Sequence, residues 1–268
     1  MRMNFPIAEA SFRGGIRDRL LLGLFVASLF LLLSMPLFST FSMRDVTGVA
    51  MTYSLSVVSA IGLILTIFLG GSLVSRDIQS RTIYSVATLP ISRSRYILEK
   101  YLGLAQLLFC SVAILGFLNF IGLTVLANAY PPDKQIIWGN YFLYLLFDLE
   151  RLLVLSSVLI LFSSVATSSF LPMILTLAVY FVGTTTEKVK YYLETFKEAE
   201  TISPLVKAIV KAAYYVFPNL SFFDLKLQAI YSLPVDFSAA FAAFFYGLGY
   251  IVIMLTLASF IFRRRDLV

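Results

Sequence analysis

Charged side chains are rare in this chain, and many of them gather in one stretch, "RDIQSRTIYSVATLPISRSRYILEKYLG", which runs from Arg76 to Gly103. Arginine and carboxylate side chains form charge-assisted hydrogen bonds, which are stronger than neutral ones. Apolar residues such as Ile83 and Val86 recur between them at helical spacing and offer a face for packing. The pattern is typical of a surface that a cytoplasmic partner binds. A solvated loop with the arginines that are common on the cytoplasmic side of a membrane is the alternative.

Few residue types in the chain can support catalysis. It has no histidine and one cysteine, Cys110. These absences exclude Cys/His zinc sites, disulfides within the chain and Ser-His-Asp catalysis. No Gly-Lys dipeptide occurs, so the phosphate-binding Walker A loop is missing and nucleotide hydrolysis is not expected. We therefore expect no catalytic residues, no metal site and no cofactor bound by this chain.

The elements that position these residues have the composition of an integral membrane protein. Hydrophobic residues make up 59% of the 268 residues and charged residues 13%, whereas soluble domains have roughly half and a quarter. A helix needs about 20 apolar residues to cross a bilayer. We predict one all-α transmembrane domain, residues 1–268, with six spans at residues 20–41, 50–74, 101–127, 152–166, 170–183 and 237–262.

The fourth and fifth spans share one run without charges, Leu152–Gly183. In its middle, Ser168 and Ser169 precede Pro172. Serine caps helix N-termini, and proline is tolerated in the first helical turn. We therefore predict a tight turn at residues 167–169 that divides the run into two short helices.

The charge distribution supports six spans. This count places both termini and residues 75–100 on one side of the membrane, with twelve basic and five acidic residues, and leaves nine basic and ten acidic residues on the other. Cytoplasmic flanks are enriched in lysine and arginine. We therefore predict a multi-pass protein of the cell membrane with both termini in the cytoplasm.

The first 19 residues are predicted to form an amphipathic helix in the membrane interface. Apolar side chains recur at Phe5, Ala8, Phe12 and Ile16, while charged residues fall between them. Such a helix can lie with its apolar face in the bilayer and its arginines among anionic headgroups. An ordinary basic flank before the first span is the alternative.

Two longer segments outside the spans are also predicted to be helical. Residues 75–95 form a cytoplasmic coupling region, in which a short amphipathic helix ends before Pro90 and Ser92 caps the next helix. Residues 184–236 form a small extracytoplasmic segment of short helices. Ser203 is the expected cap of one of them, and Ser221 of another.

One face of the second span carries small and hydroxylated residues. Such a stripe lets helices approach closely, and it can also line a pathway or meet a second copy of the chain. These residues are Thr52, Ser56, Ser59 and Thr66, with Gly62 and Gly70 nearby.

Ionisable residues occur just before the fourth span, at Asp148, Glu150 and Arg151. Placing such groups deep in a bilayer costs free energy, so they are candidates for a functional role. Here a shift of one helical turn puts them at the outer interface. We therefore expect an ion-paired interfacial helix there.

The order of these features resembles the permease subunits of type 2 ABC exporters. In that family an acidic residue, a small-small-Thr step, "PISR" and a following Tyr…Lys…Gly recur between the second and third spans. The amphipathic helix of residues 1–19 is similar to that family's elbow helix, and "FPNLSFFDLK" resembles the outer segment before the last span. The pattern departs from the family at Arg81, where glycine is common, and at Asp77, where glutamate is usual. The matching positions are Asp77, Ser80 to Thr82, Pro90 to Arg93, Tyr96, Lys100 and Gly103.

The resemblance implies a transport subunit, not an enzyme. It implies a homodimer that binds two copies of a separate ABC ATPase, which holds ATP and Mg²⁺ and drives alternating access through the coupling helix. Membrane lipids are expected partners, and nucleic acid is not. The implied ATPase-binding residues are Arg76, Asp77, Ile78, Arg81, Ile83, Val86, Pro90 and Arg93.

Two other classes remain as alternatives, a stand-alone secondary carrier and a membrane-embedded enzyme. A carrier needs inverted repeats or discontinuous helices near the midplane, and only the break before Pro172 fits. The lack of histidine argues against most hydrolases. The aromatic-rich interior with little charge favours an amphipathic, lipid-like or peptide substrate over a small ion.

Overall fold

The computed structural model describes residues 5–42, 45–79, 92–132, 135–195 and 203–264, and for residues 72–79 it describes the backbone alone. Every regular element in these ranges is a helix. The helices are α1 (Pro6–Ile16), α2 (Arg19–Leu33), α3 (Met35–Ser39), α4 (Val46–Gln79), α6 (Arg93–Ala129), α7 (Trp138–Val165), α8 (Phe170–Thr195), α9 (Pro204–Val216), the 3-10 helix η2 (Leu220–Phe223), α10 (Lys226–Ile230) and α11 (Phe237–Arg264).

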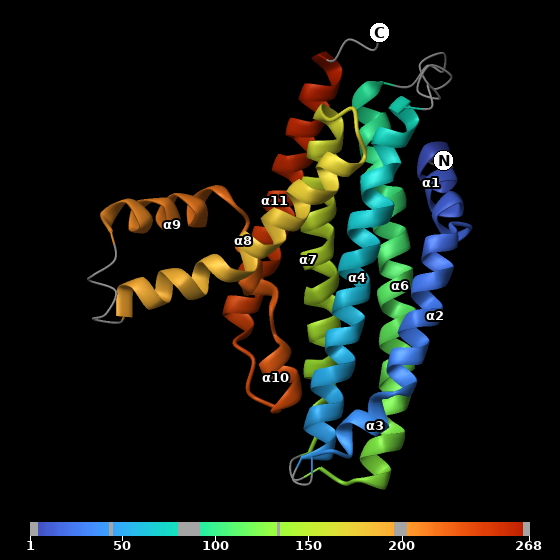
Figure 1. Cartoon of the computed structure of the whole chain (residues 1–268), viewed down its shortest axis with the longest axis vertical. Helices are drawn as coiled ribbons and strands as arrows, with labels where there is room; N and C mark the ends of the chain where they lie inside the picture. The colour runs from blue at the N-terminus through green and yellow to red at the C-terminus, as the bar shows by residue number, and fades with distance from the viewer. Residues whose placement is uncertain (1–4, 43–44, 80–91, 133–134, 196–202, 265–268) are drawn as a thin grey trace.

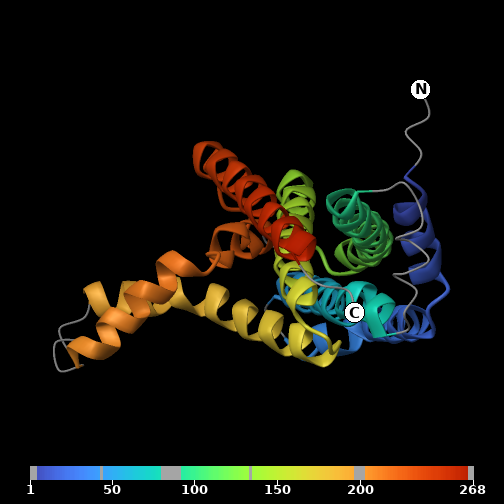
Figure 2. The ribbon, with the colours of Figure 1, turned by 90° about the horizontal axis from the view of Figure 1, so that it is seen from above.

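The long helices form a bundle around α7. Figure 1 shows α4, α6, α7 and α11 side by side, with α2 along one edge. Seen from above, α7 lies between α4, α6 and α11 (Figure 2). No proline interrupts α4, α6 or α7, and α6 ends shortly before Pro131 and Pro132. The helix at the centre of the bundle is therefore the one that carries the ionisable residues of the predicted fourth span.

α1 and the C-terminal end of α11 lie at the same end of the bundle (Figure 1). The C-terminal end of α4 and the N-terminal end of α6, which flank residues 80–91, are there too. This arrangement agrees with a topology in which both termini and the 75–95 region share one side. The identity of that side stays a prediction.

Five helical segments of the described chain are long and apolar enough to cross a membrane. α7 is at least as long as four of these segments, but every 18-residue window in it contains Asp148, Glu150 and Arg151. The predicted count of six spans therefore depends on α7 and stays a prediction. The five segments are Arg19–Ser39, Val46–Gly71, Arg93–Ala129, Phe170–Thr195 and Phe237–Arg264.

The chain breaks between Val165 and Phe170, where the serines and Pro172 predict a turn. The Ser168 hydroxyl accepts a hydrogen bond from the Phe170 backbone N–H at 3.2 Å. Both flanking helices are longer than the predicted short pair, because α7 begins at Trp138 and α8 continues to Thr195.

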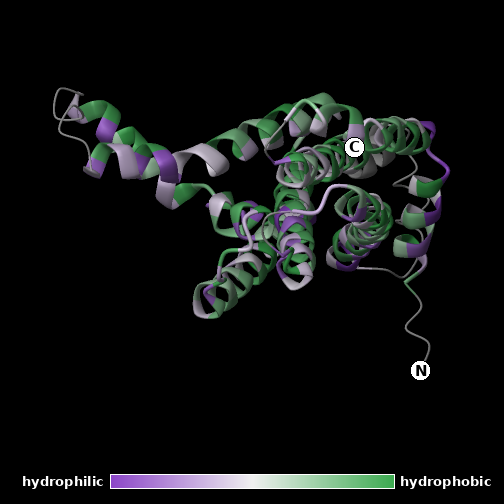
Figure 3. Cartoon of the chain, turned by 90° about the horizontal axis from the view of Figure 1, so that it is seen from below, coloured by the Kyte–Doolittle hydropathy of each residue, from purple (hydrophilic) through white to green (hydrophobic). Residues whose placement is uncertain are grey.

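The second half of α8 leaves the bundle and pairs with α9, and together they form an arm (Figure 1). Hydrophobic residues dominate the bundle helices, whereas hydrophilic and hydrophobic residues alternate along the arm (Figure 3). No residue of α9 is buried. Within residues 203–236 the expected helix start at Ser221 is wrong, because the Asn219 side chain accepts from the Ser221 N–H and so caps η2.

α1 is a separate helix, as the elbow prediction requires, and one side of it packs against α6. Ile7, Ala8 and Ser11 are buried against α6, whereas Ile16 is exposed. The chain then turns at Asp18, whose carboxylate accepts from the Leu20 N–H and caps α2. Contact with α6 therefore decides how α1 is rotated.

Candidate functional site

The first three turns of α6 join three parts of the chain. Ser92 caps this helix as predicted, since its hydroxyl accepts a hydrogen bond from the Arg95 N–H at 3.3 Å. The turns that follow contain Tyr96, Glu99 and Gly103, and all three are buried. We call residues Ser92–Gly103, together with the parts of α1 and α11 that they contact, the junction.

Glu99 connects the junction to α1. Its side chain is 0% exposed, and its carboxylate accepts hydrogen bonds from the Ile7 N–H at 2.9 Å and the Arg95 guanidinium at 2.7 Å. The first N–H groups of a helix have no partner within the helix, and a carboxylate is favourable near that positive end. Glu99 therefore holds the start of α1 against α6.

Gly103 lets α1 approach α6 closely. A Cβ atom at this position would lie 2.7 Å from the Ala8 carbonyl oxygen and 2.7 Å from the Ser11 Cβ. Real Cβ atoms almost never approach other atoms within 3.0 Å. The glycine of the sequence pattern is thus explained by a contact between two helix backbones.

The same turns of α6 also hold the C-terminal end of α11. The ring of Tyr96 stacks on that of Phe262 with centroids 5.6 Å apart, and both side chains are buried. The Arg93 guanidinium donates to the Arg263 carbonyl oxygen at 3.1 Å. A displacement of the N-terminal end of α6 therefore displaces α1 and α11 as well.

The predicted ATPase-binding residues lie before, within and after residues 80–91 of the chain. Arg76, Asp77 and Ile78 lie in the last turns of α4, which continues unbroken to Gln79, so residues 75–79 extend the second predicted span. Arg93 lies in the junction. The others, Arg81, Ile83, Val86 and Pro90, lie outside the described residues.

The small-residue stripe of α4 packs inside the protein along its C-terminal half. A Cβ at Gly62 would lie 2.5 Å from Leu152 Cδ1, and one at Gly70 would lie 2.2 Å from Leu159 Cδ2. Thr66 is fully buried, and its hydroxyl donates to the Gly62 carbonyl oxygen at 2.8 Å. Here the stripe provides the close approach of α4 to α7.

In the N-terminal half of the stripe, the hydroxyl groups form hydrogen bonds. Thr52 is exposed and donates to the Gly48 carbonyl oxygen at 2.8 Å. Ser56 accepts a hydrogen bond from the Lys226 ammonium, and Ser59 accepts one from the Arg151 guanidinium. Two hydroxyls of α4 therefore face cations of α10 and α7.

Asp148 and Arg151 form an ion pair inside the bundle. Their side chains are 1% and 9% exposed, respectively, and the pair is one helical turn apart on α7. This position differs from the interfacial one expected from the sequence, because α7 begins at Trp138 and lies between α4, α8 and α11. Asp148 Oδ2 and Arg151 Nε have no hydrogen-bond partner among the described residues. The Arg151 guanidinium also lies over the Tyr180 ring of α8, 6.0 Å from its centroid.

Lys226 brings a second cation to the same region. It is partly buried, and within the described ranges its ammonium forms no ion pair and bonds to the Ser56 hydroxyl. Burial lowers the pKa of Lys226 below the ordinary lysine value, and the nearby charge of Asp224 opposes this shift. The contact between α4 and α10 thus places the Lys226 amine, which has no ion-pair partner in the described ranges, beside Ser56 of the stripe.

Glu150 faces the opposite side of α7. It is 4% exposed, and neither carboxylate oxygen has a hydrogen-bond partner in the described part of the chain. Gly247 of α11 lies directly on it, since a Cβ there would be 2.4 Å from Glu150 Oε1. Ionisable groups within a membrane helix bundle are candidates for function.

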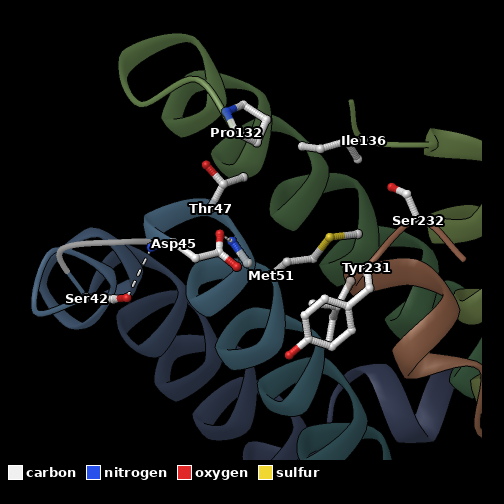
Figure 4. A pocket seen from close by; sticks show the side chains of 10 residues that line it. Ser42, Asp45, Thr47, Met51, Pro132, Ile136, Tyr231 and Ser232 are labelled. Atoms are coloured by element: carbon white, nitrogen blue, oxygen red, sulfur yellow. Dashed lines mark hydrogen bonds between the residues drawn. The ribbon is translucent and has the colours of Figure 1, made fainter. Parts of the chain in front are cut away.

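A pocket of about 320 Å³ lies at the end of the bundle opposite the termini. Figure 4 shows side chains from three segments around it, including Asp45, Met51 and Tyr231. The Thr47 hydroxyl donates to the Tyr130 carbonyl oxygen at 2.9 Å, and the Ser232 hydroxyl donates to that of Gln135 at 2.9 Å. These bonds join the three segments, so we assign the pocket a structural role.

Comparison with protein families adds evidence on the N-terminal half, which includes α2, α3, α4 and the first turns of the junction. Residues 16–132 match a family model described as ABC-2 family transporter protein. Over these residues, somewhat less than half of the chain, the protein is similar to the ABC-2 transporter family. A search of curated proteins found no match.

The ABC-2 match confirms the resemblance seen in the sequence. It covers α2, α3, α4 and α6, and therefore also the predicted coupling region. It supports a transport permease role in a membrane protein with several helices that can span a bilayer. Membrane subunits of the ABC-2 family generally work with ATPase subunits.

Sequence reasoning found some residues of the junction and missed others. The matching positions of the sequence pattern include Tyr96 and Gly103, but not Glu99, which is buried in the junction. The Arg95–Glu99 spacing, i to i+4, signals the ion pair but not the bond to Ile7. Lys226 was not singled out at all, because its partner Ser56 lies 170 residues away.

Proposed function

We propose that this chain is the membrane-spanning permease subunit of an ATP-driven ABC exporter. It works as a homodimer with two copies of a separate ATPase subunit, which binds the ATP and Mg²⁺. The observation that carries the proposal is the ABC-2 match over residues 16–132, which includes the coupling region. The missing Walker A loop supports it, because hydrolysis then belongs to another chain.

In this proposal the ATPase grips the coupling region, with Arg76, Asp77 and Arg81 in charge-assisted bonds and Ile83 and Val86 in its groove. Closure of the ATPase pair moves this region and the N-terminal end of α6 with it. Because Glu99 holds α1 and Tyr96 holds α11 there, the movement passes to both helices. A rigid-body change of this kind gives alternating access between two permeases.

The proposed orientation follows from the same argument. The ATPase is a cytoplasmic protein, so the end of the bundle with the junction and both termini faces the cytoplasm. The arm and the pocket of Figure 4 then lie away from the end of the bundle that faces the ATPase. The cell membrane is the proposed location.

The test is whether a Walker A ATPase co-purifies with the chain and whether Asp77→Ala/Arg81→Ala releases it. The matched control is Glu187→Ala/Lys188→Ala on the arm, which removes the same two charges far from the junction. We expect loss of the ATPase in the first double variant and retention in the second. Retention in both contradicts the coupling role, and transport by the purified chain without an ATPase contradicts the exporter proposal.

A further inference from the structure

A second cavity, of about 450 Å³, lies between α10 and the first turns of α11. This volume is within the range of small-molecule sites, which are mostly apolar with a few polar groups in fixed positions. The cavity shares no lining residue with the junction, the stripe or the pocket of Figure 4. No step of the proposed coupling mechanism uses it.

The cavity exists because α11 presents alanines where the facing elements present larger side chains. Ala239, Ala240 and Ala243 line one wall, and Phe222 and Leu225 line the other. Alanine side chains are too short to fill the space between the two elements. The walls are therefore suited to an apolar ligand body.

One polar group gives the cavity a preference for the ligand head. Asp236 lies at the rim and caps α11, accepting from the Ser238 N–H at 2.9 Å. In the described ranges no cation pairs with this carboxylate.

We propose that this cavity binds a membrane-partitioning amphiphile whose head is a protonated amine. The alanine wall receives the apolar chain, and the Asp236 carboxylate at the rim supplies the opposite charge. This carboxylate accepts hydrogen bonds, so a carboxylate head is disfavoured and a hydroxyl head is intermediate. The ligand reaches the site from the bilayer. Binding requires neither the ATPase nor transport.

The experiment uses the full chain in nanodiscs of phosphatidylcholine, without an ATPase. Three photoactivatable probes with the same ten-carbon chain are compared, a decylamine, a decanol and a decanoate, and the labelled peptides are identified by mass spectrometry. We expect saturable labelling of residues 225–246, with decylamine binding at least about tenfold more tightly than decanoate, as one charge-assisted bond requires. Equal labelling by decylamine and decanoate overturns the proposal.

Variants locate the binding to the cavity. Ala239→Phe fills it and is expected to abolish the labelling, whereas Val252→Phe adds the same ring at an exposed position of α11 outside the cavity. Asp236→Asn keeps a side chain that can cap the helix, removes the charge and should reduce decylamine binding to the level of decanol. Labelling that is unchanged in Ala239→Phe, or decylamine binding that is unchanged in Asp236→Asn, also overturns the proposal. Because Asp236→Asn preserves the cap, it decides the case even when Ala239→Phe fails to fold.

Discussion

The Glu99 carboxylate accepts a hydrogen bond from the Ile7 N–H at 2.9 Å, across 92 residues of sequence. This one bond connects the first helix of the chain to the helix that follows the predicted coupling region. The bond gives α1 a fixed position in the junction. An interfacial helix that is held by lipid alone would have no fixed position relative to α6. Movement of the coupling region and of α1 is therefore expected to be linked.

Glu99→Ala should release the start of α1. The substitution leaves the buried Ile7 N–H without a partner, which costs about 1–3 kcal/mol. Hydrogen–deuterium exchange of residues 6–16 should rise accordingly. Glu9→Ala is the matched control, because Glu9 pairs with Arg13 on the exposed side of α1 and exposed pairs contribute little. Unchanged exchange in Glu99→Ala contradicts the assigned role.

Gly103→Ala should separate α1 from α6. Its Cβ meets the Ala8 carbonyl oxygen at 2.7 Å, and a backbone atom cannot move aside without moving the helix. The expected result is a lower melting temperature and faster exchange in α1. Gly14→Ala is the control, because a Cβ there meets nothing within 4 Å and alanine favours the helix. If both variants melt alike, the close approach at Gly103 is not important for stability.

The sequence predicted those parts of the fold that depend on local signals. The break before Phe170 follows from serine and proline, and the start of α6 follows from Ser92. In each case the residues that decide the structure are close neighbours in sequence. Tyr96 and Gly103 of the sequence pattern lie in the junction, although the pattern did not predict their contacts with α11 and α1.

Most of what the sequence did not predict depends on contacts between distant segments. The rotation of α1 is set by its contact with Gly103, and the apolar spacing of α1 alone does not contain that information. The burial of Asp148 follows from the central place of α7 in the bundle, which hydropathy does not reveal. For the cap of η2, two competing local signals were present, and the Asn219 side chain prevailed over the Ser221 hydroxyl.

Lys226 should react with amine-specific reagents at a lower pH than an ordinary lysine. Burial lowers its pKa in the folded protein, so the neutral amine forms below about pH 10.4, the usual lysine value. Between the two pKa values the unfolded chain binds more protons, and the free energy of unfolding therefore rises with pH in that window. Acetylation measured by mass spectrometry as a function of pH gives the midpoint. A midpoint at or above the usual value contradicts the burial of this amine.

The buried ion pair on α7 gives a prediction in which two changes are better tolerated than one. Asp148→Leu leaves the Arg151 guanidinium buried without its carboxylate, and breaking such a pair costs about 3–5 kcal/mol. Asp148→Leu/Arg151→Met removes both charges and fills the space with apolar groups, a replacement that is often neutral.

Thermal unfolding in detergent micelles should therefore show a large loss of stability in the single variant and a much smaller one in the double variant. The control is Glu9→Leu/Arg13→Met, which replaces the exposed pair of α1 and should leave the melting temperature nearly unchanged. Equal losses in the single and double variants at Asp148 and Arg151 contradict this prediction. The destabilisation then comes from the Ser59 hydroxyl that loses its donor, or from packing against Tyr180, and not from an unpaired charge.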